Sequence, residues 1–153
     1  MRSASLVLGV ILTMSLPSQS VAQGAAPASV TKGVAQVADW ILQSAESVPA
    51  EKYSFRPVEG TRTFAQLVAH IIDGYHYYCR LAKGPMEWSD KAEKTAGTKA
   101  ELMKQLRAAT AECTSLSGGK LDPQVENLGH TNLHYGNMIV YLRLMGITPA
   151  SSR

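Results

Sequence analysis

The spacing of apolar residues predicts a helical protein. Apolar side chains recur every three or four positions in four segments, residues 31–47, 63–83, 98–117 and 127–145. Proline or glycine follows each segment, at Pro49, Gly84, Gly118 and Gly146. No stretch of useful length alternates apolar and polar residues as a strand would, and the sequence contains no internal repeat. The pattern therefore predicts an all-α fold, a four-helix bundle.

Two of the predicted helices begin with a capping box. Thr63 precedes Gln66 by three positions, and Thr98 precedes Glu101 in the same way. The connection between these two helices, residues 84–97, is long enough to return along the bundle, so the second and third helices could run parallel.

The N-terminus has the pattern of a cleavable signal peptide. Arg2 supplies a positive charge, residues 6–16 are apolar, and a small-x-small cleavage pattern ends at Ala22. The alternative, an uncleaved membrane anchor, is disfavoured by the short apolar run. The predicted organisation is a signal peptide, a flexible lead-in and one four-helix bundle, over residues 1–22, 23–30 and 31–150. We therefore expect a periplasmic or secreted protein without stable membrane insertion after cleavage.

Composition excludes several classes of protein. The chain of 153 residues is 45% hydrophobic and 18% charged, which is typical of one globular domain. Its 15 Lys and Arg against 12 Asp and Glu give a net charge of +3, and the basic residues do not cluster, so no nucleic-acid partner is expected. Two cysteines are too few for a disulfide-rich scaffold.

Three histidines are candidate metal ligands. His130 and His134 lie one turn apart on the last predicted helix, the spacing with which two imidazoles share an ion. They continue into an inward stripe formed by Asn137, Met138, Tyr141 and Met145. His70 lies beside the apolar face of the second helix. Three neutral imidazoles plus water form the open arrangement of catalytic zinc and also suit nickel. The alternative is a set of half-buried histidines that bind carbonyl groups or water.

Four polar side chains could surround this site. Asp73 follows His70 by three positions and is the nearest carboxylate that could orient its ring. Tyr77 lies on the same side of that helix, and Asn137 and Tyr141 lie on the stripe of the last helix. We expect these residues in the second shell or in a pocket, although core and rim packing is the simpler interpretation for the tyrosines. No catalytic residue can be assigned.

Two segments resemble the DinB-like family of DNA-damage-inducible proteins. The chain reads His-Thr-Asn-Leu-His-Tyr-Gly-Asn from residue 130, then an apolar run, Tyr-Leu-Arg and Gly-Ile-Thr-Pro. This is similar to the family's C-terminal signature. Residues 53–71 are similar to its Arg/Lys-Pro loop, which leads into a helix carrying Leu-x-x-His. The likeness covers about residues 34–150.

The resemblance implies an up-down-down-up bundle that holds a divalent metal, zinc or nickel, on His70, His130 and His134. Many relatives have another histidine at the position of Leu133, so a role for a neighbouring imidazole is not expected here. Some members are thiol-dependent transferases or isomerases, and others are described as metal-dependent hydrolases. The family name describes induced expression and implies no DNA contact.

We therefore expect an exported metal-dependent hydrolase that acts on an unknown small-molecule substrate. The alternatives are a non-enzymatic metal- or small-molecule-binding bundle, a thiol-dependent transferase, which fits less well outside the cytoplasm, and a purely structural bundle. Bundles of this kind often dimerise, so a homodimer is an open alternative to a monomer.

Helix register bears on the cysteines and on the histidines. If the second and third helices are parallel, Cys79 and Cys113 lie at similar height and could form a disulfide in an oxidising compartment. The alternative is two buried free thiols. The last helix would be antiparallel to the second. With their ends level, His70 would lie about 10 Å along the bundle from His130 and His134. A metal site therefore requires a shift of the last helix by about two turns.

Overall fold

The computed structural model describes residues 24–116 and 120–153, and the expected signal peptide lies outside the described residues. Within those ranges the chain forms helices and no strand, apart from one isolated bridge between Ala25 and Lys120. The elements in order are α1 (Ala28–Ser47), the 3-10 helix η1 (Ala50–Lys52), α2 (Phe64–Leu81), α3 (Lys91–Lys94), α4 (Lys99–Thr114), α5 (Leu121–Leu144) and the 3-10 helix η2 (Ala150–Ser152). The all-α prediction is confirmed.

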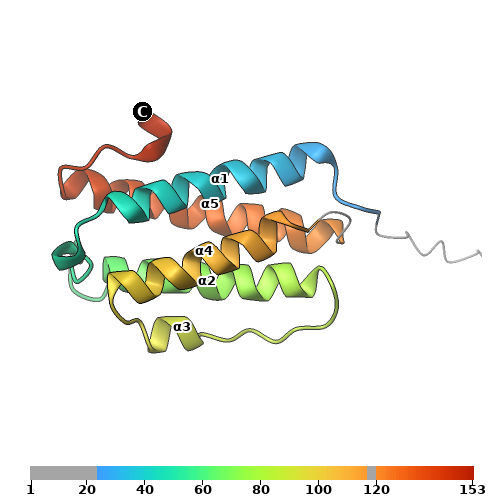
Figure 1. Cartoon of the computed structure of the whole chain (residues 1–153), viewed down its shortest axis with the longest axis horizontal. Helices are drawn as coiled ribbons and strands as arrows, with labels where there is room; N and C mark the ends of the chain where they lie inside the picture. The colour runs from blue at the N-terminus through green and yellow to red at the C-terminus, as the bar shows by residue number, and fades with distance from the viewer. Residues whose placement is uncertain (1–23, 117–119) are drawn as a thin grey trace, which may run out of the picture.

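The four long helices pack as a bundle (Figure 1). Helices α1 and α5 run side by side in one direction, whereas α2 and α4 run side by side in the opposite direction. Helix α2 also packs against α5, and α1 against α4, so the four helices enclose one core. This is the up-down-down-up order that the resemblance implied. It makes α2 and α5 antiparallel neighbours, and these are the two helices that carry the candidate metal ligands.

Local signals in the sequence fix where α2 and α4 begin. The Thr63 hydroxyl accepts a hydrogen bond from the Gln66 amide at 3.1 Å, and the Gln66 side chain accepts one from the Thr63 amide at 2.9 Å. Thr98 and Glu101 make the equivalent pair of bonds at the start of α4, at 3.3 and 2.8 Å. Both predicted capping boxes are therefore present, and each satisfies backbone donors that the first helical turn leaves without partners.

Apolar side chains from all four helices fill the core. The large side chains that are almost completely buried include Tyr75, Phe64, Ile41, Leu106 and Met138. Burial of such side chains is the main driving force that holds an amphipathic helix in place. In the described part of the chain, no helix combines the length and the hydropathy that a membrane crossing would require.

The start of α5 differs from the sequence prediction. The helix begins at Leu121, six residues before the expected start at residue 127, and it includes Pro123, which precedes that expected start. Proline is tolerated in the first turn because the amide hydrogen that it lacks would have no intrahelical partner there. Helix α1 also begins early, at Ala28, which lies inside the expected lead-in.

The relative position of α2 and α5 along the bundle brings His70 level with His130 and His134. The Tyr141 hydroxyl donates a hydrogen bond of 2.7 Å to the carbonyl of Arg62, just before α2 begins. Tyr141 is therefore level with the start of α2, and the rest of α5 continues beyond it. The assumption that the two helix ends are level was wrong, because the 24-residue α5 extends past the 18-residue α2.

A disulfide joins the two parallel helices α2 and α4. It links Cys79 to Cys113, whose Cα atoms are 5.2 Å apart, a usual separation for a disulfide. The side-chain nitrogen of Asn127 lies 3.7 and 3.9 Å from the two sulfur atoms. The bond fixes the pairing of α2 and α4 at the ends where both helices approach α5.

Candidate metal centre

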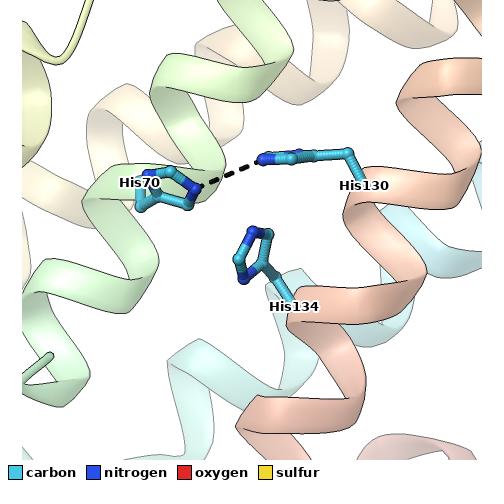
Figure 2. A group of neighbouring side chains, drawn as sticks. All are labelled: His70, His130 and His134. Atoms are coloured by element: carbon cyan, nitrogen blue, oxygen red, sulfur yellow. Dashed lines mark hydrogen bonds between the residues drawn. The ribbon is translucent and has the colours of Figure 1, made fainter. Parts of the chain in front are cut away.

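The bundle brings the three candidate histidines together between α2 and α5. His70 projects from α2, and His130 and His134 project from successive turns of α5 toward it (Figure 2). One ligand atom from each side chain can be chosen so that all three lie within 4.8 Å of one another. The ring centroids are 4.5 to 5.2 Å apart. The three side chains can therefore converge on a single point.

The donor atoms fit a divalent ion. The Nε2 atoms of His70 and His130 are 3.3 Å apart. Two nitrogens bound at about 2.0–2.1 Å to one tetrahedral zinc would be about 3.3–3.4 Å apart. The Nδ1 atoms of His130 and His134 are buried without a hydrogen-bond partner in the described part of the chain. Buried imidazole nitrogens normally have partners, so the Nδ1 atom of His134 is available to a cation, whereas the Nδ1 atom of His130 faces Gly74 and would stay without a partner when Nε2 binds the ion.

The imidazoles on α5 are held in the neutral form that binds metals. Burial, together with the smaller effects of the charges of His134, His70 and Arg62, lowers the pKa of His130 to about 3. Burial likewise lowers the pKa of His134 to about 4, with additional contributions from His70 and Arg62. Near neutral pH no proton therefore competes with a cation for these two rings.

A glycine on α2 makes room for His130. A Cβ atom at Gly74 would lie 2.2 Å from Cε1 and 2.6 Å from Nδ1 of His130, closer than nonbonded atoms approach. The His130 ring therefore packs directly on the α2 backbone one turn after His70. Among the other described glycines, none has a histidine so close to the position of a Cβ atom.

The carboxylate that contacts His70 is Glu93, whereas we had expected Asp73. Glu93 Oε2 lies 2.8 Å from His70 Nδ1. A carboxylate at Nδ1 accepts a hydrogen bond from that nitrogen and leaves Nε2 as the atom with the free lone pair. The Nε2 atom is the one that faces His130. Glu93 thus selects the tautomer in which His70 can act as a ligand.

Asp73 supports the site indirectly, through the backbone of α3. Its two carboxylate oxygens accept hydrogen bonds from the backbone amides of Ala92 and Glu93, at 3.0 and 2.9 Å, in the first turn of α3. The carboxylate is almost completely buried. Asp73 therefore anchors the short helix α3, and α3 presents Glu93 to His70. The functional assignment of Asp73 changes from orienting the imidazole to positioning the segment that orients it.

Arg62 binds the carboxylate of Glu93. Its guanidinium contacts both oxygens of Glu93, at 2.7 and 3.2 Å. Burial alone would raise the pKa of Glu93, but the hydrogen bonds from Arg62 and His70 outweigh it, so the pKa lies below its usual value. Glu93 is therefore an anion that accepts hydrogen bonds, and its low basicity makes it a poor general base.

Aromatic rings cover the outer side of His70 and His130. The Trp88 ring lies 5.6 Å from His70 and 6.1 Å from His130, and Tyr78 lies 5.3 Å from His130. Tyr77 contacts Trp88 at 5.4 Å rather than any histidine. Tyr77 also lines a pocket of about 470 Å³ beside Asp73 and α3. This aromatic cover excludes water from one side of the site.

Asn137 and Tyr141 lie near Arg62 and Glu93. They line a second pocket of about 530 Å³ with Arg62 and Glu93. The Tyr141 hydroxyl is already bonded to the Arg62 carbonyl, so its ring forms a wall of this pocket and its oxygen holds the loop before α2. Because Arg62 and Glu93 also contact His70, this pocket adjoins His70.

Several residues of the site could not be found from the sequence. Glu93 and Trp88 lie in a connection without an apolar period, and Arg62 precedes a helix cap. The one sequence signal for the short helix α3 is the spacing of Asp90 and Lys94, because oppositely charged residues four apart can pair on one helix face. In the structure, the Lys94 ammonium lies 3.1 Å from the Asp90 carboxylate. The fourth histidine, His76, lies apart from the three ligands and pairs with Glu112 at 3.4 Å.

Sequence comparisons agree with the helical fold. The chain is 25% identical over 124 residues to the uncharacterized protein YjoA of Bacillus subtilis (strain 168), an alignment that covers 68% of this chain and 80% of YjoA. A sequence model described as the DinB superfamily matches residues 34–122. That range contains His70 and Glu93 but ends before His130 and His134, whose place in the site comes from the structure. On this match, together with the all-helical bundle, the chain belongs to the DinB superfamily.

Proposed function

We propose that this protein holds one divalent cation, zinc or nickel, on His70, His130 and His134 and is an exported metal-dependent hydrolase of a small molecule. The observation that carries the metal site is the convergence of three imidazole donors on one point, two of them 3.3 Å apart through Nε2. The open coordination position that three histidines leave is typical of catalytic rather than structural zinc sites.

A bound cation would supply this site with an acidic water molecule, or with a Lewis acid for a substrate oxygen. The protein's own residues support such chemistry in distinct ways. Glu93 holds the His70 ring and its tautomer, and Trp88 and Tyr78 shield the imidazoles on one side. The pocket lined by Arg62, Asn137 and Tyr141 offers a polar space for a substrate beside the site.

One observation favours a second candidate, a metal-binding bundle without turnover. Both carboxylates near the histidines are engaged, because Asp73 binds two backbone amides and Glu93 binds Arg62 and His70. Neither is free to take a proton from water. If hydrolysis occurs, its proton acceptor must be supplied by the substrate or by the metal-bound hydroxide itself.

Elemental analysis of the purified protein tests the metal site. We expect about one equivalent of zinc or nickel in the parent protein and none in a His130→Ala/His134→Ala variant, because one remaining imidazole cannot hold the ion. His76→Ala is the matched control and should retain the metal, since His76 pairs with Glu112 outside the site. Absence of metal from the parent after incubation with zinc and nickel would overturn the proposal. Metal binding without hydrolysis of an ester and amide panel would favour the second candidate.

Export is a separate part of the proposal and is supported by two features. The first 22 residues have the charge, apolar run and small-x-small ending of a signal peptide. The Cys79–Cys113 disulfide is a bond that persists in oxidising compartments. We therefore propose a periplasmic or secreted location for the mature chain.

Expression of the full chain in a Gram-negative host tests the export proposal. The periplasmic protein should begin at Gln23, as read by N-terminal sequencing, and should show no free thiol after denaturation. An Ala22→Arg variant should keep its N-terminal segment, because signal peptidase requires a small residue before the cut. Recovery of an uncleaved chain with two free thiols from the cytoplasm would contradict both predictions.

A further inference from the structure

The pocket of about 470 Å³ beside α3 has no part in the hydrolysis proposed above, and none of the three candidate metal ligands lines it. Its walls come from α2, from the connection before α3, from α3 itself and from α4. Sites that bind small molecules usually have volumes of about 300–1,000 Å³. This α3 pocket, whose lining includes Tyr77, Arg80, Met86, Lys91 and Ala92, is therefore large enough for a ligand of its own.

Part of the lining of the α3 pocket is apolar. Tyr77 and Met86 are half-buried, and Ala92 is almost completely buried. The Tyr77 ring lies edge-on to the rings of Tyr78 and Trp88, at centroid distances of 4.9 and 5.4 Å. These contacts hold the Tyr77 ring in place, so the pocket presents a preformed apolar surface to the body of a ligand.

Basic side chains gather at one end of α2 around a single carboxylate. Two guanidinium nitrogens of Arg80 lie 3.3 and 3.5 Å from the carboxylate of Glu112. The same carboxylate is 3.4 Å from His76 Nδ1 and 3.7 Å from the Lys83 ammonium. Three basic groups thus share one acid, and Arg80 and His76 both line the α3 pocket. The Arg80 guanidinium therefore keeps donor capacity for a second anion.

Lys91 adds a second cation from α3. Within the described ranges its ammonium has no ion-pair or hydrogen-bond partner. Two acidic residues also line the pocket, but both oxygens of Asp73 already accept hydrogen bonds from the amides of Ala92 and Glu93. The other acid, Glu87, is exposed. The polar groups that are available to a ligand are therefore mainly hydrogen-bond donors.

We propose that the α3 pocket binds a small organic acid, whose carboxylate contacts Arg80 and Lys91 and whose apolar body packs on Tyr77 and Met86. Arginine and lysine bind carboxylates through charge-assisted hydrogen bonds, which are stronger than bonds between neutral groups. An acid with about ten non-hydrogen atoms should bind with a Kd of about 0.1–1 mM.

Such a ligand would join α3 to α2, because Lys91 lies on α3 and Arg80 and Tyr77 lie on α2. A helix of four residues is not stable by itself, so an additional contact should hold α3 more firmly. Glu93 on α3 contacts His70. On the basis of the metal site proposed above, an occupied pocket should therefore strengthen zinc binding several-fold, and zinc should strengthen acid binding by the same factor.

Calorimetric titration of the metal-free protein, kept in a chelator, tests the pocket without the metal. The probes are benzoate, hydrocinnamate and hexanoate, with hydrocinnamide as the uncharged match of hydrocinnamate and inorganic phosphate as an anion without an apolar body. At least one acid should bind in the range given above, and the amide and phosphate should each bind at least roughly 10-fold more weakly. The proposal is overturned if no acid binds at up to about 10 mM, or if the amide or phosphate binds equally well.

Charge-removing variants locate the bound acid. Arg80→Gln and Lys91→Gln should each weaken its binding by roughly 10-fold, because each removes one charge-assisted hydrogen bond. Lys94→Gln is the matched control, since Lys94 also lies on α3 but pairs with Asp90 and does not line the α3 pocket. Equal binding to the parent and to both pocket variants would show that the acid lies elsewhere.

Chelator competition with and without the acid measures the coupling to zinc. The acid should raise zinc affinity several-fold in the parent and should have little effect in Lys91→Gln. An acid that binds only to the zinc-loaded protein would lie on the ion and would contradict the proposal. Unchanged zinc affinity in a protein that binds both would show that α3 does not connect the two sites. Failure to bind zinc would instead refute the proposed metal site, and the titration of the metal-free protein would still decide the acid site.

Discussion

Replacing Asp73 with alanine should lower the free energy of unfolding by about 3 kcal/mol, because two hydrogen bonds to a buried carboxylate are lost. The amides of Ala92 and Glu93 would lose their acceptor, and α3 is too short to hold its own position. Since Glu93 would then be less well placed beside His70, zinc affinity should also fall by roughly 10- to 100-fold. Urea unfolding of the metal-free protein and competition with a zinc chelator measure the two effects.

Two variants separate the roles of Asp73. Asp90→Ala removes the exposed carboxylate that directly precedes α3 and pairs with Lys94, so it should leave the stability nearly unchanged. Glu93→Ala should weaken zinc binding as Asp73→Ala does, but should cost less stability because the amides of α3 keep their acceptor. Equal zinc affinity in the parent and in Asp73→Ala would show that α3 does not position Glu93.

The Gly74→Ala variant should destabilise the metal-free protein by about 1–3 kcal/mol and abolish stoichiometric metal binding. The added Cβ atom would lie 2.2 Å from Cε1 of His130, so the imidazole must leave its position against α2. A ring displaced in this way cannot share an ion with His70. Thermal unfolding with and without zinc measures both losses, because a protein that binds zinc in the native state should melt at a higher temperature when zinc is present.

The same substitution should have the opposite sign once His130 is absent. In a His130→Ala background no imidazole meets the new methyl group, and alanine favours a helix interior over glycine by up to about 1 kcal/mol. Gly74→Ala should then stabilise the protein. Destabilisation of equal size in both backgrounds would mean that the close approach of His130 to α2 is not what requires glycine at position 74.

Helix identity could be predicted from the sequence because local signals were consistent with one another. The capping boxes at Thr63 and Thr98 mark helix starts with side chains that act within one turn. The spacing of His130 and His134 predicted that they share one helix face, because residues four apart lie one turn apart on a helix. The start of α5 was missed because proline is a breaker in most helical positions but is neutral in the first turn.

The support of the site could not be predicted in the same way. Glu93 reaches His70 across 23 positions of sequence, through a short helix held by a carboxylate from α2. Nothing in the local pattern of residues 84–97 indicates that contact, because it depends on how the connection folds back over the bundle. Asp73 was noticed for its position after His70, yet its partners are amides that no spacing rule connects to it.

The disulfide makes the support of the site part of a closed ring. Cys79 and Cys113 are separated by 34 positions, and the chain between them carries both Trp88 and Glu93. In the chain-entropy treatment, closing a loop of this size removes about 4 kcal/mol of disorder from the unfolded state. A single proteolytic cut in the exposed segment around Trp88 would leave both fragments covalently joined. The segment that carries Trp88 and Glu93 is thus linked to the bundle at both ends. After a proteolytic cut, this segment stays attached only as long as the surroundings keep the disulfide oxidised.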